Sequence, residues 1–181
     1  MRTAPVLQQE LDSLLPSRDL SRRGFVKTAV GSGFAAAVLP VTAQTIKTDS
    51  EGLTVGEVTI PVGDFKMPAY SARPAGKTGL PVILVVSEIF GVHEHIADIA
   101  RRFAKLGYLA IAPELFVRQG DAQSYGEIAK LVSEVIAKTP DAQVMGDLDA
   151  SVAWARANGG DVSRLGITGF CWGGRTTWMY S

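Results

Sequence analysis

The stretch that says most about the architecture of this chain is GITGFCWGGRTT, Gly166–Thr177. The residues from Arg164 to Thr168 have the composition of a short strand, and they run directly into Gly169-Phe-Cys-Trp-Gly173. This G-x-C-x-G pattern is typical of a sharp turn from a strand into a helix, with a nucleophile at its tip. Glycines two residues before and after the nucleophile let strand and helix approach closely. We therefore expect Cys171 at the tip of such a turn.

Strand signals recur upstream of this turn. Leu53–Ile60 and Phe65–Arg73 alternate between apolar and polar residues and are bounded by Gly and Pro, which predicts an antiparallel pair. Pro81–Ser87 is a continuous apolar run of the kind found in strands that are buried on both faces. Tyr108–Ala112 is a second short buried strand, closed by Pro113.

Helical periodicity separates these strands. Three apolar stripes predict three helices, the last beginning at Thr139-Pro140 with Thr139 as N-cap. The stripes consist of Ile96, Ile99, Ala100, Phe103 and Leu106; of Ile128, Leu131, Val132 and Val135; and of Val144, Leu148, Val152 and Ala155. Alternating strands and helices predict an α/β fold whose mostly parallel sheet carries helices on both faces.

The composition limits the classes of function. With 181 residues, 46% hydrophobic and 20% charged side chains, the chain has the composition of one soluble globular domain. Its 18 Lys and Arg residues balance 18 Asp and Glu residues, and no basic stripe alternates with aromatic residues. We therefore expect no nucleic-acid partner.

Residues 1–43 differ from the rest and look like a twin-arginine signal peptide. Arg22-Arg23 precedes the uncharged stretch Thr28–Ala43, which ends in small residues suited to cleavage. About 16 apolar residues are fewer than the roughly 20 of a membrane span, so no stable span is expected. The interpretation makes the twin-arginine export machinery a partner and predicts a periplasmic or exported protein, with residues 44–181 as its domain. A chance Arg-Arg pair before a buried helix is the alternative.

A single cysteine in an exported protein cannot form an internal disulfide. Cys171 is therefore either a small buried apolar residue or a working thiol. Its position before a predicted helix favours the second interpretation, because a helix N-terminus stabilises the thiolate.

Three ordered motifs together resemble the dienelactone hydrolase family, α/β-hydrolases with a cysteine nucleophile that open cyclic enol-lactones. They are Glu88-Ile-Phe-Gly-Val-His93, Leu115-Phe-Val-Arg-Gln119 and Gly169-Phe-Cys-Trp-Gly-Gly174. The resemblance extends from about Leu53 to the end of the chain. It implies an α/β-hydrolase-type sheet and a carboxylated lactone or an ester as the small-molecule substrate.

The resemblance also implies a role for five residues. Cys171 attacks the carbonyl carbon and forms a thioester, and Glu88 contacts the resting thiol and helps to create the thiolate. The backbone N–H groups of Ile89 and Trp172 form the oxyanion hole. Arg118 holds the carboxylate of the substrate, for which a bidentate guanidinium is suited.

Other interpretations of these side chains stay open. Glu88 could be a loop cap or the partner in a salt bridge, and Arg118 could be a solvated surface residue. His93 and His95 do not have the spacing of two ligands on one helical face, so we expect capping or solvated histidines. No metal and no cofactor is expected.

The general base is the missing part of the pattern. In α/β-hydrolases the acid and the histidine follow the nucleophile, but none of the ten residues after Cys171 is Asp, Glu or His. We therefore expect a fold truncated after the nucleophile turn, with both residues beyond Ser181. The alternative, from a different class, is a catalytically inactive truncated protein or a thiol-bearing binding module.

Overall fold

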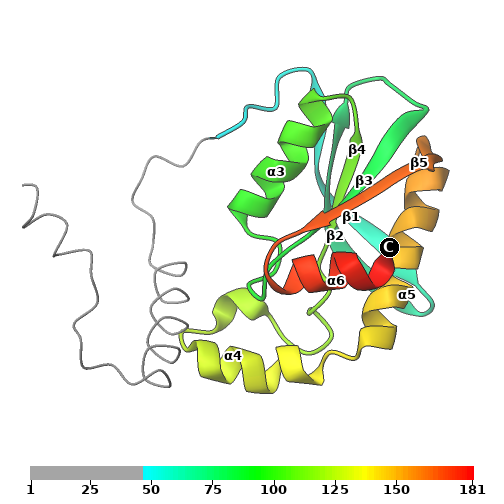
Figure 1. Cartoon of the computed structure of the whole chain (residues 1–181). Helices are drawn as coiled ribbons and strands as arrows, with labels where there is room; N and C mark the ends of the chain where they lie inside the picture. Colours follow the sequence, from blue (N-terminus) through cyan, green and yellow to red (C-terminus); the bar gives the residue numbers. More distant parts are fainter. Residues whose placement is uncertain (1–46) are drawn as a thin grey trace, which may run out of the picture. The chain divides into compact units, whose positions relative to one another are not determined.

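A computed structural model of the chain describes residues 47–181 (Figure 1). The expected signal peptide and its boundary at residue 43 lie outside these residues. Five strands form one sheet in the order β1-β2-β4-β3-β5. The strands are β1 Leu53–Val62, β2 Phe65–Pro74, β3 Leu80–Val86, β4 Leu109–Pro113 and β5 Gly160–Gly169. The helices are α3 Glu94–Lys105, α4 Ile128–Glu134, α5 Asp141–Ala157 and α6 Trp172–Tyr180, with short 3-10 turns at Ala122–Ser124 and Ile136–Lys138.

The sheet is mixed. β3 pairs in parallel with β4 and β5, as the alternation of strands and helices predicts. β1 and β2 form the expected antiparallel pair, turning at Gly63 with a φ of 57°. β2 also pairs antiparallel with β4. The expectation of a mostly parallel sheet therefore holds for β3, β4 and β5, while the hairpin adds an antiparallel side.

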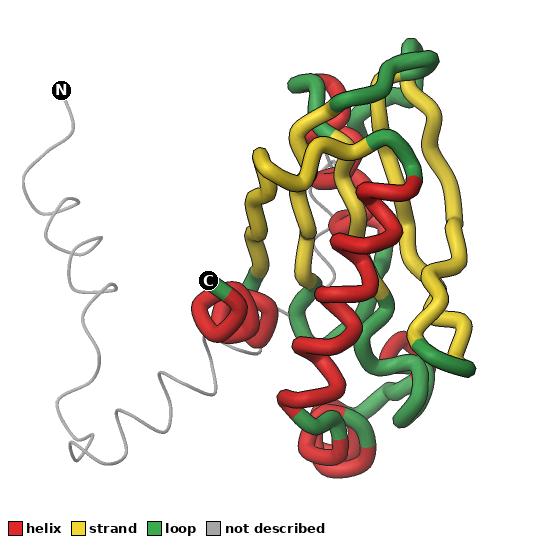
Figure 2. Tube along the Cα trace, turned by 90° about the vertical axis from the view of Figure 1, so that its right-hand side faces the viewer, coloured by secondary structure: helices red, strands yellow, loops and turns green. Residues whose placement is uncertain are grey.

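Helices cover both faces of the sheet (Figures 1 and 2). Leu84 and Val86 of β3 pack in one apolar cluster with Val144 and Leu148 of α5. Ile83, which points the other way, packs with Ala100 and Ala104 of α3. Because consecutive side chains of a strand face opposite sides, a strand covered on both faces must be apolar throughout. This explains the unbroken apolar run of β3.

Three details of the predicted helices are wrong. Leu106 is 73% exposed, because α3 ends at Lys105 and Leu106 only caps it. Val132 is 41% exposed, because the short helix α4 buries only the side that carries Leu131. The N-cap of α5 is Pro140, and the hydroxyl of Thr139 donates instead to the carbonyl oxygen of Val135.

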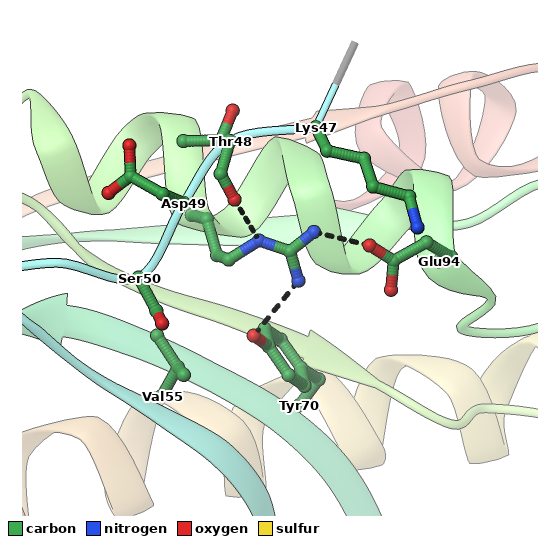
Figure 3. Close-up of a pocket in the computed structure, with 8 residues that line it drawn as sticks. Lys47, Thr48, Asp49, Ser50, Val55, Tyr70 and Glu94 are labelled. Carbon is green, nitrogen blue, oxygen red and sulfur yellow. Dashed lines mark hydrogen bonds and ion pairs between the residues drawn. The ribbon is translucent and has the colours of Figure 1, made fainter. Parts of the chain in front are cut away.

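The segment before β1 is held against α3 by two buried charged side chains, Asp98 and Arg101. Asp98 accepts a hydrogen bond from the backbone N–H of Thr48, and Arg101 donates to the carbonyl oxygen of the same residue. Figure 3 shows Thr48, Tyr70 and Glu94 around this guanidinium, in a depression of about 380 Å³. The residues that line the depression include none of the candidate site residues.

None of the helices in residues 47–181 combines the length and the apolar character needed to cross a bilayer.

Candidate active site

The carboxyl ends of β3 and β5 meet where the order of the strands reverses. After β3 the chain adds β4 on one side of it and then β5 on the other. Ligands of open α/β sheets bind at such a reversal, beyond the carboxyl ends of the strands. The β3–β5 ladder ends at the pair Val86 and Gly169. Glu88 and Cys171 each lie two residues past that pair, so the sheet brings these two predicted site residues to the same place.

Cys171 forms the tip of the predicted turn. It has a φ of 53° and a ψ of −111° and occupies the N-cap position of α6. Within residues 47–181 it is the only residue other than glycine with a positive φ. A side chain at such a backbone conformation is strained, and strained residues gather at functional sites because the surrounding structure must hold them.

Close packing around the turn explains both of its glycines. A Cβ atom at Gly169 would overlap the carbonyl group of Gly173. A Cβ atom at Gly173 would lie 2.5 Å from the carbonyl oxygen of Ser87, which no real side chain tolerates. The first contact joins β5 to α6, and the second joins α6 to the end of β3. The predicted requirement for glycine is confirmed at both positions.

The thiol of Cys171 is exposed, and no hydrogen bond among the described residues involves its sulfur. Two backbone donors of the predicted oxyanion hole are also free. Within the described part of the chain, no hydrogen bond uses the N–H of Ile89 or that of Trp172. Trp172 is the first residue of α6, so no carbonyl group of the helix can accept a hydrogen bond from its N–H. An exposed thiol with two free N–H groups suits attack on a carbonyl whose oxygen becomes negatively charged.

Ile89 and Trp172 belong to one apolar cluster, although 83 positions separate them in the sequence numbering. Ile89 is 6% exposed, and the half-buried ring of Trp172 packs against the same cluster. The ring of Trp172 lies 4.6 Å from that of Phe116, centroid to centroid. This packing holds the backbones after β3 and β5 together independently of any substrate.

The carboxylate of Glu88 is turned to His93. Its Oε2 atom lies 3.0 Å from Nε2 of His93, and the two side chains are 21% and 29% exposed. Burial by itself would raise the pKa of Glu88. The hydrogen bond from His93, a backbone hydrogen bond and the charges of His93 and His95 outweigh burial and lower that pKa below its ordinary value. The structure therefore shows the salt-bridge arrangement, and the role of Glu88 toward the thiol stays a prediction.

His93 also caps α3. Its Nδ1 atom accepts a hydrogen bond of 3.3 Å from the backbone N–H of His95. Of the two expectations for the histidines, capping is the one that the structure shows for His93. Within residues 47–181, no three His, Cys, Asp or Glu side chains are grouped in a way that could hold a metal ion.

Arg118 lies in a partly buried ion pair. Its two terminal nitrogens donate to both oxygens of Asp147, at 2.6 and 2.8 Å, and Asp147 on α5 is completely buried. The guanidinium carbon also lies 4.1 Å from the centre of the Phe65 ring. Arg118 is thus more enclosed than a solvated surface residue, and its terminal nitrogens already bind a carboxylate of the chain. Its expected role toward substrate stays a prediction.

Sequence reasoning missed Glu114, which directly follows β4. Its Oε1 atom accepts a hydrogen bond of 2.8 Å from the N–H of Val92, so it holds the loop between Ile89 and His93. Gly91 has a φ of 74°, a backbone conformation that favours glycine, and a Cβ atom there would lie 2.8 Å from the end of this carboxylate. Burial raises the pKa of Glu114, and the hydrogen bond from Val92 opposes the rise only in part. An acidic residue at the carboxyl end of a buried strand was the available signal.

The chain is similar to several known proteins. The model of the dienelactone hydrolase family matches residues 67–181. A Methylorubrum extorquens protein named "Putative carboxymethylenebutenolidase" is 59% identical over 174 residues, which are 95% of this chain and 60% of that protein. An Escherichia coli K12 protein of the same name is 54% identical over 155 residues, covering 85% of this chain and 57% of that protein.

Among solved structures, one described as a dienelactone hydrolase from Klebsiella pneumoniae is 56% identical with a TM-score of 0.69. The match covers 71% of this chain and 54% of that one. The chain therefore spans between 54% and 60% of the length of these three relatives.

Proposed function

The chain belongs to the dienelactone hydrolase family, and from that premise we propose that it carries the nucleophile of a hydrolase that opens lactones or cleaves esters. The observation that carries the proposal is the backbone of Cys171, an exposed cysteine held at a positive φ between β5 and α6. Such strain persists only where the surrounding structure maintains it, and here it presents a thiol at the reversal point of the sheet.

In the proposed reaction the thiolate of Cys171 attacks the carbonyl carbon of the substrate. A carbon–sulfur bond forms while the carbonyl oxygen gains negative charge, which the N–H groups of Ile89 and Trp172 stabilise. The carbonyl re-forms as the carbon–oxygen ester bond breaks, and the leaving oxygen takes up the proton that the thiol released when it became a thiolate. Water then cleaves the thioester, releasing the product carboxylate and the thiol.

Glu88 and Arg118 act beside this centre in the proposal. Glu88 assists formation of the thiolate, for which its place at the end of β3 is suitable. Arg118 binds a carboxylate on the substrate, and Arg118→Ala then weakens carboxylated lactones by about 1.5 to 3 kcal/mol while neutral esters are spared. Because Arg118→Ala also removes the partner of the buried Asp147, both losses are measured per folded protein, and equal losses on the two kinds of substrate would then remove Arg118 from the site. Asp147 competes for the same guanidinium, so a substrate carboxylate would use the remaining N–H donors or displace one bond.

A thiol-bearing binding module is the second candidate, and one observation favours it. The two histidines are His93 and His95, and neither has a hydrogen bond to Cys171 in the described part of the chain. His93 instead uses one ring nitrogen on Glu88 and the other on the cap of α3. A thiol without a general base could capture a ligand without turning it over.

Trapping of the thioester separates these candidates. The protein is mixed with a carboxylated dienelactone and with a neutral aryl ester, quenched in acid and digested for mass spectrometry. We expect an acyl group on the peptide that contains Cys171 and none in Cys171→Ala, whereas turnover also requires a general base for the hydrolytic water. A noncovalent complex without acylation would support the binding module, and turnover retained by Cys171→Ala would exclude Cys171 as the nucleophile.

Export is a separate proposal that rests on residues 1–43. We propose that the twin-arginine machinery translocates the protein and that cleavage follows Ala43. Changing Arg22 and Arg23 together to Lys should keep the protein in the cytoplasm, as seen by fractionation. Unchanged export of that variant, or an intact Met1 on exported protein, would refute the proposal.

A further inference from the structure

The loop that follows β3, residues 89–92, has almost no hydrogen bonds of its own. Among the described residues, no hydrogen bond uses the N–H of Ile89, Phe90 or Gly91. At the end of the loop, the N–H of His93 donates to the carbonyl oxygen of Gly91 at 3.1 Å. A segment with so few bonds of its own takes the position that its neighbours impose on it.

Two side chains from the segment after β4 hold this loop at Val92. Oε1 of Glu114 accepts a hydrogen bond from the N–H of Val92 at 2.8 Å, and Nε2 of Gln123 donates to its carbonyl oxygen at 3.3 Å. No other hydrogen bond in the described part of the chain joins residues 89–92 to another segment. Glu114 is partly buried, whereas Gln123 is exposed to water, which competes for its contact. Glu114 therefore makes the stronger of the two contacts.

Glu114 is itself fixed to the sheet. Its N–H donates to the carbonyl oxygen of Pro68 on β2 at 3.0 Å. Two residues later, Phe116 packs in the apolar cluster that contains the side chain of Ile89. The segment after β4 thus holds the loop at both ends, at Ile89 by apolar contact and at Val92 by the carboxylate.

We propose that Glu114 is a positioning residue of the active site, which holds Val92 and so keeps the N–H of Ile89 directed at the carbonyl oxygen of the substrate. Its effect on catalysis rests on the proposed function, in which Ile89 supplies one of the donors to the oxyanion. Glu114 contacts neither the substrate nor the thiol in this proposal and acts only through the loop.

Packing of the Ile89 side chain alone does not determine the direction of its N–H. Apolar contact is non-directional, and the backbone between Ile89 and Val92 includes Gly91, whose φ is 74°. The hydrogen bond at Val92 removes this freedom by fixing the other end of the loop. A donor stabilises an oxyanion only when it points to the place where the charge develops. A displacement of about 1 Å in a catalytic site lowers a rate by about 100-fold.

Two substitutions of Glu114 separate its acceptor from its charge. Glu114→Gln keeps an oxygen that can accept the N–H of Val92 but removes the charge. Glu114→Leu removes both the charge and the acceptor. Gln123→Ala is the matched control, because it removes the exposed contact to the same residue, Val92.

Two reactions of Cys171 differ in their need for an oxyanion hole. Acylation by a neutral aryl ester places negative charge on the carbonyl oxygen, whereas alkylation by iodoacetamide displaces iodide and forms no oxyanion. The 181-residue chain has one cysteine, so mass spectrometry of the whole chain measures both rates. We expect Glu114→Leu to slow acylation by about 10-fold to 100-fold and alkylation by less than about twofold. Both rates should stay within about twofold of the unmodified chain in Glu114→Gln and Gln123→Ala.

Amide NMR gives a readout that does not require acylation. In the unmodified chain, the N–H of Val92 should exchange slowly with solvent and the N–H of Ile89 rapidly. Glu114→Leu should accelerate the exchange of Val92 by about tenfold and shift the signal of Ile89. Glu114→Gln should leave both signals close to those of the unmodified chain.

Rapid exchange of Val92 in the unmodified chain would overturn the proposal, and so would unchanged acylation in a folded Glu114→Leu. Equal losses of acylation and alkylation would overturn it too, because they would show an effect on the thiol or on the whole fold. A loss in Glu114→Gln as large as that in Glu114→Leu would assign the effect to charge instead of the acceptor.

Two further outcomes remain decisive. If Glu114→Leu does not fold, Glu114→Ala, which adds no bulk beside Gly91, replaces it in the same assays. If the unmodified chain is not acylated, the proposed hydrolase fails, and the exchange of Val92 still decides whether Glu114 holds the loop. Failure of this proposal and failure of the proposed function are therefore observed separately.

Discussion

The backbone of one residue, Cys171, carries the strongest indication of function. A cysteine at a φ of 53° is sterically strained, whereas a glycine at the same φ would not be. Its neighbours cannot relax it, because Gly169 and Gly173 are already in contact with backbone atoms. The strain is therefore a property of the turn, and substitution at this residue can measure it.

We predict that Cys171→Gly is more stable than Cys171→Ala by about 1 to 3 kcal/mol in the free energy of unfolding. Both variants lack the thiol, but only the glycine removes the strained Cβ atom. At an ordinary backbone conformation the order would be reversed, because glycine loses more entropy on folding. Urea denaturation of the two variants provides the comparison, and an alanine variant as stable as the glycine variant would contradict the strain.

Glu114 gives a prediction about pH. Burial raises its pKa in the folded protein above the unfolded value of 4.5. Its favourable contribution is therefore complete below about pH 4.5 and is lost as the pH rises through the folded pKa. Glu114→Gln keeps an acceptor for the N–H of Val92 but carries no charge. We compare the Tm of Glu114→Gln with the Tm of the unmodified protein at each pH. The difference, variant minus unmodified, should be more positive at pH 8 than at pH 4.

The control for this measurement is Glu127→Gln. Glu127 is exposed, and its ion pair with Lys130 has a long separation of 3.5 Å. Its Tm difference from the unmodified protein should be similar at both pH values. A Glu114→Gln difference that does not change with pH would show that Glu114 is not held as a buried charge.

At the scale of elements, the turn between β5 and α6 depends on how closely α6 approaches β3. Gly173 lies against the carbonyl groups of Val86 and Ser87, whereas the neighbouring Gly174 has ordinary space around it. A Cβ atom at Gly174 would lie 3.6 Å from the carbonyl oxygen of Gly169. Two adjacent glycines of one helix therefore differ in whether the packing leaves room for a side chain.

We predict opposite effects of alanine at these two positions. Gly173→Ala forces α6 away from β3 and should destabilise the protein by about 1 to 3 kcal/mol. Gly174→Ala should stabilise it by about 0.5 to 1 kcal/mol, because alanine favours a helix. Thermal denaturation of both variants tests the pair. A similar small effect of both substitutions would mean that the turn is not tightly packed.

At the scale of the whole molecule, the pair Arg118 and Asp147 joins distant parts of the chain. Arg118 follows β4, Asp147 lies on α5, and Phe65 at the start of β2 stacks on the guanidinium. Asp147 is fully buried and depends on Arg118 for its neutralising charge. Loss of the arginine would leave an uncompensated charge among apolar side chains, which is strongly unfavourable.

We predict that Arg118→Ala destabilises the protein by about 3 to 5 kcal/mol and that the combination Arg118→Met with Asp147→Leu restores most of this loss. Arg175 is a matched control, because it forms the same two-bond contact with Asp141, at 2.9 and 2.8 Å, but in an exposed position. Arg175→Ala should change stability little. Urea denaturation of these variants measures the difference, and equal effects of Arg118→Ala and Arg175→Ala would contradict a buried ion pair.

Local patterns in the sequence were sufficient for the architecture. The strands, the α/β class and the turn at Cys171 depend on periodicity and on glycines within a few residues of each other, and all of these can be read along the chain. The exact ends of helices were predicted less accurately. Leu106 and Val132 continue apolar stripes in the sequence, but burial depends on what packs against a helix and not on its own pattern.

The partners of the charged side chains could not be read in the same way. Glu88, Arg118 and Glu114 stand next to strand ends in the sequence, but nothing local selects His93, Asp147 and the N–H of Val92 as their partners. Arg118 and Asp147 are 29 residues apart, and a buried charge accepts whichever opposite charge the packing of the elements brings to it. Periodicity and glycine spacing act over a few residues and so predict where the thiol is presented. Electrostatic pairing acts across space, so only the folded arrangement shows which groups surround that thiol.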